Sequence, residues 1–505
     1  MKSVDVRLPA ALVASAVAAL LPGCTHRTRP GAPAASALST GSSAGAPPSA
    51  IVANAAPARA RPSGPLRFVA IGGGATPEST EISLEQDIEL VAGTLPLPGT
   101  VLFAGGSGSL SVREANPRPH GDSVLLALGD LFHPRAGRQS RYGAVRLDAA
   151  RASVENVEAT LGAALSSGEG PLLLYIAAHG DQGEAPRDNL VALWGGQPLT
   201  VARLAELHEQ HPRPLRLVVT SCFSGGFGEL AFEHADERKG PSHALRCGVF
   251  AGPWDRETSG CDPNPDRKAQ ESYGLHFIHA LAGKDRDGHP LPESSVDFNH
   301  DGKVGLLDAH TRARIAAMSL DVPTTTSERF LRSAEHGSAA VDRAVLPEDA
   351  AVVDALGAAL GLKDEAAVEK RWNELDAHMT RLDDALNDAQ SVLAVKESTL
   401  GSRLLERWPM LDDAFHPDFA ETFRKNRDAI AEVLEHSPEA LARAKAREEV
   451  DGADEELSGL EVEEARLLRL RRAYETLHLA AALLHKGGPA ARYYSALLGC
   501  ERAAP

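Results

Sequence analysis

The sequence predicts an α/β domain with a largely parallel sheet flanked by helices, followed by an all-α, coiled-coil-like C-terminal domain. Three observations lead to this fold class. Short apolar runs that end in glycine alternate with stretches of helical spacing up to about residue 335, as in a sheet buried on both faces. Beyond that point heptad spacing replaces the apolar runs. With 505 residues and a hydrophobic fraction of 43%, the chain can form a core in each of two domains.

The N-terminus combines a basic start, a short apolar run and a cysteine. Lys2 and Arg7 precede the apolar run LPAALVASAVAALL, and the tetrapeptide LPGC ends at Cys24. The run is short and rich in alanine, which fits a signal peptide (1–23) better than a transmembrane span. The tetrapeptide resembles the bacterial lipobox, and this resemblance implies that Cys24 is lipidated and anchors the protein in the cell envelope. An ordinary signal peptide with an incidental cysteine is the alternative.

The composition predicts a disordered tether before the folded part, and the net charge excludes some classes of partner. Residues 24–64 are rich in Ala, Pro, Ser and Gly and show no periodic apolar pattern, which is typical of a disordered tether. The formal net charge is −17, so a nucleic-acid backbone or an anionic bilayer surface would repel the protein. We therefore expect no nucleic-acid partner, and contact with the lipid bilayer only through the N-terminal lipid.

The α/β domain (65–335) is predicted from segments that alternate along the chain. LRFVAIGGG, GTVLFAGG, PLLLYIAAHG and LRLVVTSCFSGG are apolar runs that predict buried strands. Helical spacing lies between them, at SLEQDIELVAGTL, at 152–165 and at 200–211. The pattern continues through ALRCGVFAG and SYGLHFIHALAG. Strands joined by helices favour parallel pairing.

The C-terminal domain (336–505) is predicted to consist of long packed helices, because two apolar seams alternate spacings of three and four residues. The first seam comprises Val368, Trp372, Leu375, Met379, Leu382, Leu386, Ala389 and Leu393, and the second comprises Leu467, Leu470, Tyr474, Leu477, Ala481 and Leu484. An antiparallel pair or small bundle with Pro409, Pro417 and Pro438 in its connections is the simplest arrangement. The seams could be buried within one chain or between two, so a protein partner or self-association through these helices stays open.

A histidine and a cysteine follow two successive predicted strands. His179 is the penultimate residue of PLLLYIAAHG, and Cys222 lies in LRLVVTSCFSGG. Glycine follows each of them within a few residues. Reactive groups gather at the carboxyl ends of parallel strands, and rigid strands can hold an imidazole and a sulfur at a fixed separation. A thiolate nucleophile with a histidine partner requires such an arrangement. A buried core cysteine beside an incidental His-Gly pair is the alternative.

The stretches YIAAHGDQG and VVTSCFSGG resemble the caspase/legumain clan of cysteine peptidases, in which one strand ends in His-Gly and the next in Cys. SYGLHFIHAL and PTTTSERFL are similar to segments of bacterial members, so the resemblance covers roughly residues 66–332. It implies a caspase-like fold and a peptidase that acts on polypeptides without a cofactor. By this resemblance Cys222 is the nucleophile, His179 the general base or acid, and the backbone N–H groups of Gly180 and Cys222 the oxyanion hole.

The resemblance leaves the substrate preference undecided. Thr220 lies two residues before Cys222, so its side chain should face the same way and line the substrate pocket. Members of that clan carry Asp, Gln or Glu at that place, and Thr220 supplies no countercharge for a basic side chain. A catalytically silent scaffold that binds a partner in the same groove is therefore the rival hypothesis. A serine hydrolase is disfavoured, because Ser224 lies in SCFSGG and not in a Gly-x-Ser-x-Gly elbow.

The stretch DFNHDGKVGLLD (297–308) predicts a calcium-binding loop. Its ligands would be the side chains of Asp297, Asn299 and Asp301, the carbonyl of Lys303 and the closing carboxylate of Asp308. Asp308 is shorter than the usual glutamate, so weaker closure is expected, and the calcium would have a structural or regulatory role. An Asx-turn before the following helix is the alternative.

The remaining cysteines predict a disulfide. Cys24 is assigned to the lipid and Cys222 to catalysis. Cys247 and Cys261 flank the loop GVFAGPWDRETSG and could form a disulfide in an oxidising compartment. Cys500 is then left over.

Overall fold

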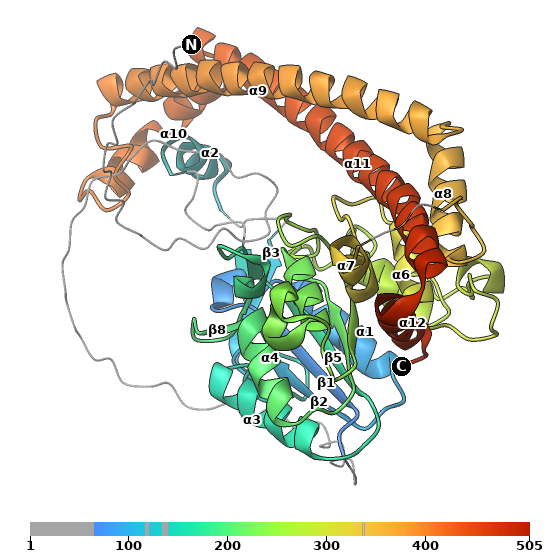
Figure 1. Ribbon diagram of the computed structural model, residues 1–505. Helices are drawn as coiled ribbons and strands as arrows, with labels where there is room; N and C mark the ends of the chain where they lie inside the picture. The colour runs from blue at the N-terminus through green and yellow to red at the C-terminus, as the bar shows by residue number, and fades with distance from the viewer. Residues whose placement is uncertain (1–64, 117–120, 134–139, 336, 338) are drawn as a thin grey trace, which may run out of the picture.

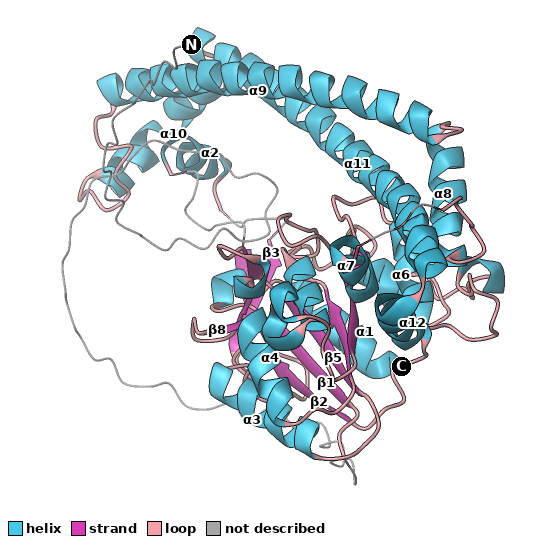
Figure 2. Ribbon diagram, in the orientation of Figure 1, coloured by secondary structure: helices cyan, strands magenta, loops and turns pink. Residues whose placement is uncertain are grey.

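The computed structural model describes residues 65–116, 121–133, 140–335, 337 and 339–505. An α/β domain lies beneath an arch of long helices from the C-terminal third of the chain (Figure 1, Figure 2). The predicted signal peptide, the lipidated Cys24 and the tether lie outside the described residues. Among the helices that the structure describes, none is both long and apolar enough to cross a membrane.

A six-stranded sheet forms the centre of the α/β domain, in the spatial order β11-β10-β9-β5-β1-β2. Its strands are β1 (Phe68–Gly73), β2 (Gly99–Phe103), β5 (Leu172–Ala178), β9 (Leu215–Val219), β10 (Arg246–Phe250) and β11 (Thr324–Thr325). All neighbours pair in parallel except β11, which is antiparallel to β10. Every residue of β1, β5 and β10 is buried, which explains why continuous apolar runs encode these strands. The predicted mostly parallel sheet is confirmed.

Helices cover both faces of this sheet, and the strand residues divide between two cores by alternation. Helices α1 (Ile82–Thr94), α5 (Tyr273–Leu281) and α6 (Leu306–Ala316) cover one face, and α3 (Val154–Ser166) and α4 (Val201–Gln210) cover the other. Tyr175 and Ala177 of β5, with Val218 of β9, pack toward α1 and α5. Leu174 and Ile176 pack toward α3 and α4. The alternation decides which layer the residues beyond each strand face.

Smaller elements extend the α/β domain. A hairpin of β3 (Leu110–Ala115) and β4 (Ser140–Ala144) carries α2 (Ser123–Phe132) between its strands. A separate antiparallel sheet consists of β6 (Gly180–Asp181), β7 (Leu190–Ala192) and β8 (Pro198–Thr200), and α7 (Thr326–Ser333) follows β11. Short 3-10 helices span Pro77–Ser79, Pro186–Asp188, Ser224–Ala231, Glu233–Ala235, Glu237–Lys239 and Glu293–Ser295. The sequence pattern does not predict the hairpin or α2, because short and partly exposed elements carry little periodic signal.

The C-terminal helices form a long antiparallel hairpin. The elements are α8 (Pro347–Leu360), α9 (Glu365–Arg407), α10 (Phe419–His436), α11 (Pro438–Lys486) and α12 (Gly488–Arg502). The ion pair Arg371–Glu463 joins the first part of α9 to the middle of α11, and Arg403–Glu439 joins the end of α9 to the start of α11. The two helices therefore run antiparallel, as predicted. Four of the eight seam residues of α9 are buried within the chain, namely Val368, Leu375, Leu386 and Leu393.

A buried arginine fixes the base of the hairpin to the α/β domain. The guanidinium of Arg469 in α11 donates to the backbone carbonyls of Arg314, Ala317, Ser319 and Asp321, at 2.6–3.1 Å. Its exposed fraction is 1%. Burial lowers the pKa of Arg469 to about 10, so the group still carries its charge at neutral pH. Four carbonyls that α6 and the following loop leave without helical partners are satisfied in this way.

Helix α2 makes a second attachment at the far end of the hairpin (Figure 1). Val124 and Leu128 of α2 are buried in a cluster with residues of α9 and α10. Asp122, which caps α2, pairs with Arg427 of α10 at 2.5 Å. Because α2 is inserted between two strands of the α/β domain, the hairpin is held at both ends.

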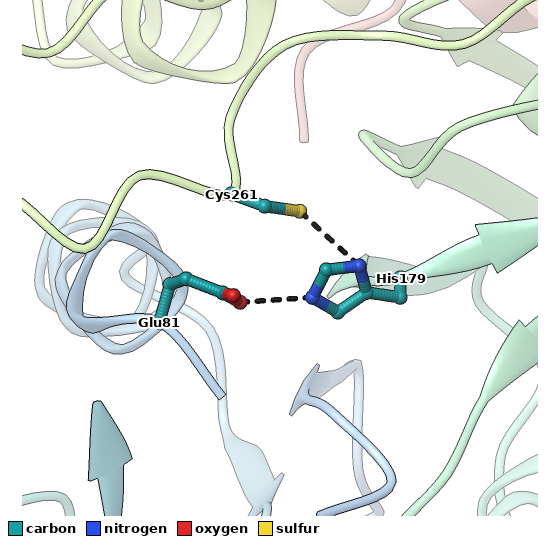
Figure 3. Close-up of side chains that lie close together, drawn as sticks. All are labelled: Glu81, His179 and Cys261. Atoms are coloured by element: carbon teal, nitrogen blue, oxygen red, sulfur yellow. Dashed lines mark hydrogen bonds and ion pairs between the residues drawn. The ribbon is translucent and has the colours of Figure 1, made fainter. Parts of the chain in front are cut away.

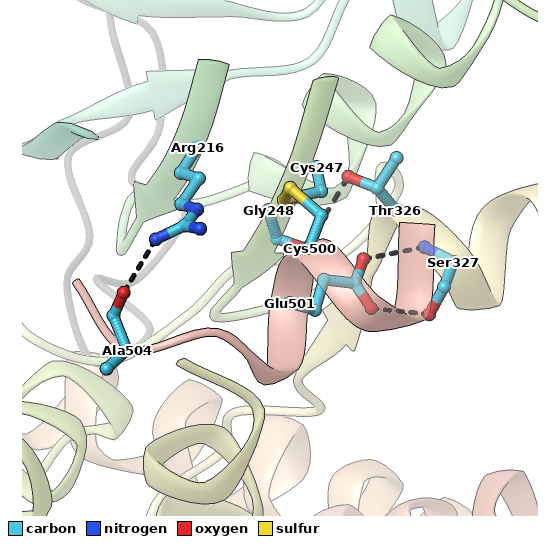
Figure 4. The surroundings of a disulfide bond; sticks show 8 residues. All are labelled: Arg216, Cys247, Gly248, Thr326, Ser327, Cys500, Glu501 and Ala504. Carbon is cyan, nitrogen blue, oxygen red and sulfur yellow. Dashed lines mark hydrogen bonds between the residues drawn. A yellow bond between two sulfur atoms is a disulfide. The ribbon is translucent and has the colours of Figure 1, made fainter. Parts of the chain in front are cut away.

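Cys247 pairs with Cys500, so the predicted Cys247–Cys261 disulfide is wrong (Figure 4). The Cα atoms of the pair are 6.1 Å apart, with Cys247 in β10 and Cys500 in α12. Cys247 is buried in the core that α12 shares, whereas Cys261 packs against the core beneath α1 and α5. Cys261 is close to Cys247 in the sequence, but its side chain lies in a different layer of the domain. Cys261 is therefore not part of a disulfide and remains a thiol.

Removing this disulfide should loosen the docking of α12 on the sheet. Cys500→Ser opens a link between residues that are 253 positions apart, so we expect the free energy of unfolding to fall by about 2–5 kcal/mol. Urea unfolding followed by circular dichroism measures the change, and Cys261→Ser, which removes a thiol outside the disulfide, is the control. A non-reducing peptide map that joined Cys247 to Cys261 would contradict the pairing.

Candidate active site

The pairing of β5 with β9 brings His179 and Cys222 to the same edge of the sheet. The strands are parallel, and Ile176 pairs with Val219. His179 is three residues beyond Ile176 and Cys222 is three beyond Val219, so both leave neighbouring strands, about 4.8 Å apart, at the same level. At Gly180 an added Cβ would lie 2.1 Å from the carbonyl oxygen of Cys222. The two chain segments are thus in direct contact, and only glycine fits there.

Both predicted site residues face the layer formed by α1 and α5. His179 continues the alternation of Tyr175 in β5, and Cys222 continues that of Val218 in β9. The exposed fractions of His179 and Cys222 are 7% and 3%. Immediately after Cys222 the chain turns through Phe223, whose backbone is left-handed with φ 58°. The turn ends the strand direction and leaves the sulfur at the edge of the sheet.

His179 lies between a carboxylate and a thiol (Figure 3). Its Nε2 is 2.8 Å from Oε2 of Glu81, the residue that precedes α1. Its Nδ1 is 3.7 Å from Sγ of Cys261. When Nε2–H of the neutral ring donates to the carboxylate, Nδ1 has a lone pair that can accept a proton from a thiol.

Glu81 is held from its other side by a cation. Its Oε1 accepts a hydrogen bond of 2.6 Å from Nη2 of Arg113 in β3, and the Glu81 side chain is 3% exposed. Burial acts to raise the pKa of the Glu81 carboxyl, but the hydrogen bonds and charges of His179 and Arg113 outweigh it and hold that pKa below its usual value. Glu81 is therefore an anion at neutral pH, with one oxygen for each partner.

A loop between β10 and α5 covers the sulfur of Cys222. We call residues 252–271 the covering loop. The backbone N–H of Thr258 in this loop donates to Sγ of Cys222 at 3.3 Å, and the carbonyl oxygen of Thr258 lies 3.5 Å from the same sulfur. Cys261, the thiol beside His179, belongs to the same loop. The covering loop therefore contacts both residues of the predicted dyad.

Polar contacts fasten the covering loop across α1. Arg267 forms an ion pair with Asp87, a carboxylate of α1 whose side chain is 4% exposed. Ser83 and Asp262 exchange two hydrogen bonds, of 2.8 and 3.3 Å. Side-chain and backbone contacts thus hold the loop down along more than one turn of α1.

Thr220, predicted to line a substrate pocket, is half-buried beneath α5. Its Oγ1 donates to the carbonyl of Ile176 at 3.3 Å. Its methyl carbon lies against Gly274 of α5, where an added Cβ would be 3.3 Å from it and 3.2 Å from Oδ2 of Asp87. A buried carboxylate therefore does lie beside Thr220, and Arg267 neutralises it.

The predicted calcium loop arranges its side-chain oxygens around its own backbone. Oδ1 of Asp297 and Oδ1 of Asn299 both accept the backbone N–H of Asp301, at 3.2 and 3.0 Å. Asp308 accepts the N–H of Phe298 at 2.9 Å, so the twelfth position of the loop lies beside the second. Burial raises the pKa of the Asp308 carboxyl.

The carboxylates of Asp297, Asp301 and Asp308 do not bring three oxygens within 4.8 Å of one another, whereas three groups elsewhere among the described residues bring metal-binding atoms that close. They are Glu81 with His179 and Cys261, Glu209 with Glu233 and His234, and Asp285 with Asp287 and His289. In the first group the carboxylate and the thiol approach different ring nitrogens (Figure 3). One ion could bind only one nitrogen of this ring, so the arrangement fits proton transfer better than metal binding.

Several residues of this site are not predicted by the sequence. Glu81 at the start of α1, Asp87 within α1 and Cys261 in the covering loop all reach it, and Glu81 lies 98 residues before its partner His179. The segment ESTEISLEQD is dense in carboxylates for a helix that packs on a sheet. That density is the one available signal, because buried carboxylates need partners, but it does not say which partner each one has.

No family model matches the chain, and no curated protein matches it. The resemblance to the caspase/legumain clan therefore stays a prediction. Because one fold supports many activities, a function has to be argued from the geometry of the site.

Proposed function

We propose that the protein is a cysteine endopeptidase in which Cys222 is the nucleophile and His179 the general base and acid. The register of β5 and β9 is the observation that supports this most, because it sets the two residues level at the carboxyl edge of a parallel sheet. The sequence resemblance to the caspase/legumain clan points to the same pair. The substrate is a polypeptide, and the envelope location follows from the signal and lipobox pattern that ends at Cys24.

The proposed reaction has two halves. His179 takes the thiol proton of Cys222, and the thiolate attacks the carbonyl carbon of the peptide bond. The C–N bond then breaks while the imidazolium gives its proton to the leaving amine, and a thioester remains. Water that loses a proton to His179 hydrolyses the thioester, and the thiol is restored. Backbone N–H groups of Gly180 and Cys222 would stabilise the oxyanion in both halves, and no metal or cofactor is needed.

A catalytically silent binding lipoprotein is the second candidate function. The observation that favours it is the burial of the site, since Cys222 is 3% exposed and Thr258 contacts its sulfur. A peptide carbonyl can reach Sγ only after the covering loop has moved. In the binding alternative the loop never needs to open, and the helical hairpin would hold the partner.

Cys222→Ala should abolish cleavage of every peptide that the wild-type protein cuts, because no thioester can form. His179→Ala should lower kcat/KM by about 10²–10⁴-fold, since both proton transfers depend on the imidazole. Profiling a peptide library by mass spectrometry supplies the substrates and measures the rates.

Cys261→Ala tests which of the two cysteines, Cys222 or Cys261, is the nucleophile. We expect this variant still to cleave peptides. Loss of cleavage in Cys261→Ala with retention in Cys222→Ala would transfer the nucleophile to Cys261. If the wild-type protein cut no peptide, the binding alternative would gain.

We also propose that the 297–308 loop binds Ca²⁺. The oxygens of Asp297 and Asn299 converge on one N–H group, and Asp308 links the end of the loop to its start. Oxygen ligands around a flexible loop are what calcium prefers. The loop leads into α6 through Gly305, where an added Cβ would lie 1.9 Å from the carbonyl of Arg502 in α12. Calcium would therefore stabilise the contact between α6 and α12, a structural role.

Calcium should raise the melting temperature of the protein, because it binds the folded loop and not the unfolded chain. Asp297→Ala and Asp301→Ala should each remove the increase, as measured by differential scanning calorimetry with and without Ca²⁺. Asp285→Ala, in a neighbouring acidic turn, is the matched control and should keep the increase. An undiminished increase in both loop variants would place the ion elsewhere.

A further inference from the structure

We propose that Glu81 is a positioning residue for His179, so that the site is a Cys–His–Glu triad. This inference rests on the proposed peptidase function, and it adds a residue to the machinery. Oε2 of Glu81 is 2.8 Å from Nε2 of His179, and the side chains are 3% and 9% exposed. A carboxylate that accepts from one ring nitrogen decides which tautomer is present and how the ring is turned.

The backbone around Glu81 makes it a rigid support. Glu81 pairs with Arg113 in an isolated parallel bridge, and the N–H of Arg113 donates to the carbonyl of Thr80 at 2.7 Å. The carbonyl of Glu81 also accepts the N–H of Leu84 at the first turn of α1. The carboxylate therefore approaches His179 from a point that is fixed on two elements.

The position of the carboxylate has a consequence for the reaction. With the proton of Nε2 donated to Glu81, Nδ1 is the basic nitrogen, and it faces the thiol of Cys261 in the covering loop. After His179 has taken a proton from Cys222, the negative charge of Glu81 stabilises the imidazolium. Arg113 shares that charge through the other oxygen, so it weakens the stabilisation and keeps Glu81 ionised.

Titration of the imidazole tests this proposal without any substrate. In the Cys222→Ala background, NMR of isotope-labelled histidine follows protonation of His179. Glu81→Gln keeps the shape of the side chain and removes its charge, so the pKa of His179 should fall. Arg113→Gln removes the competing cation, so the same pKa should rise. Glu114→Gln, which alters a buried carboxylate paired with Arg141 and Arg146, is the matched control and should leave it unchanged.

Activity supplies the second readout. Glu81→Gln in the active protein should lower kcat by about 10²-fold or more with a smaller change in KM, because the carboxylate acts on His179 and does not touch substrate. An unchanged pKa of His179 in Glu81→Gln would overturn the proposal, whatever the activity. If the two variants shift the pKa in opposite directions and the wild-type protein cuts no peptide, the positioning role stands and the peptidase function fails.

A separate set of contacts supports a second proposal: the covering loop is an internal blocking segment, and its release opens the site. This too rests on the proposed function and concerns its regulation. The N–H and the carbonyl of Thr258 lie 3.3 and 3.5 Å from Sγ of Cys222, where an attacked carbonyl would have to approach. The hydroxyl of Thr258 lies 3.8 Å from the same sulfur. One residue of the loop thus surrounds the nucleophile with polar groups.

An ion pair with a buried carboxylate holds the covering loop down. The side chains of Arg267 and Asp87 are 22% and 4% exposed. Lifting Arg267 away would leave the carboxylate buried without a countercharge, which is unfavourable. The loop therefore leaves α1 only when another cation replaces Arg267 or when a force on the loop offsets the loss.

The helical hairpin is positioned to supply such a force. Nη2 of Arg256 in the covering loop is 2.5 Å from Oε2 of Glu464 in α11. The carbonyl of Arg256 accepts the N–H of Phe223, the residue after Cys222, at 2.9 Å. A displacement of α11 would therefore act on the loop and on the turn behind the nucleophile through one residue.

The rate at which iodoacetamide alkylates Cys222 in the full-length protein tests the blocking role. Peptide mapping by mass spectrometry separates Cys222 from Cys261. Arg267→Ala should raise the rate at Cys222 by about tenfold or more, because it favours local opening of the loop. Lys268→Ala is the matched control, since Lys268 is the next residue and pairs with the exposed Asp287. Glu464→Gln should raise the rate from the other end of the loop without altering the α/β domain.

Three outcomes bear on the blocking proposal. Unchanged alkylation of Cys222 in both Arg267→Ala and Glu464→Gln would overturn it. Faster alkylation in these variants with no peptide cleavage by any of them would support the blocking role and refute the peptidase function. Faster alkylation together with faster cleavage would support both.

Discussion

The parallel pairing of β5 with β9 is the constraint on which the candidate site depends. His179 and Cys222 each lie three residues beyond Ile176 and Val219, which pair in the register of these strands, so the two side chains leave the strands at the same level. Because successive strand residues face opposite layers, a slip of one residue would turn Cys222 away from His179 and toward the other core. The carboxylates of α1 and the covering loop can converge on the site only because both residues face their layer.

The helical hairpin is joined to the α/β domain at several places. Arg469 satisfies four carbonyls at its base, Cys500 bonds to β10, and α2 packs into its far end. These three attachments use different kinds of interaction, so they depend on different solution conditions. The covering loop touches both bodies through Arg256, which makes the position of α11 relevant to the state of the site.

Much of the fold could be predicted from the sequence, because strands that are buried on both faces of a sheet consist of continuous apolar residues. The apolar runs before His179 and Cys222 predict adjacent strands. The apolar seam of α9 from Val368 to Leu393 predicts the helical hairpin. The disulfide was predicted wrongly: Cys261 is near Cys247 along the chain, but strand alternation and the docking of α12 decide which sulfur faces which. The hairpin β3–β4 and α2 left no periodic signal, and their role appears only where α2 meets α9 and α10.

By itself the sequence determined the strand order along the chain, the heptad seams and the two residue types that could carry nucleophilic chemistry. Those properties are local, since they follow from hydrophobic period and from which residue ends a strand. Only the tertiary structure decided that Glu81 supports His179, that Arg267 neutralises Asp87 and that Thr258 covers Cys222. These are contacts between segments far apart in the chain, and polar partners of this kind depend on the packing of layers and not on any period in the sequence.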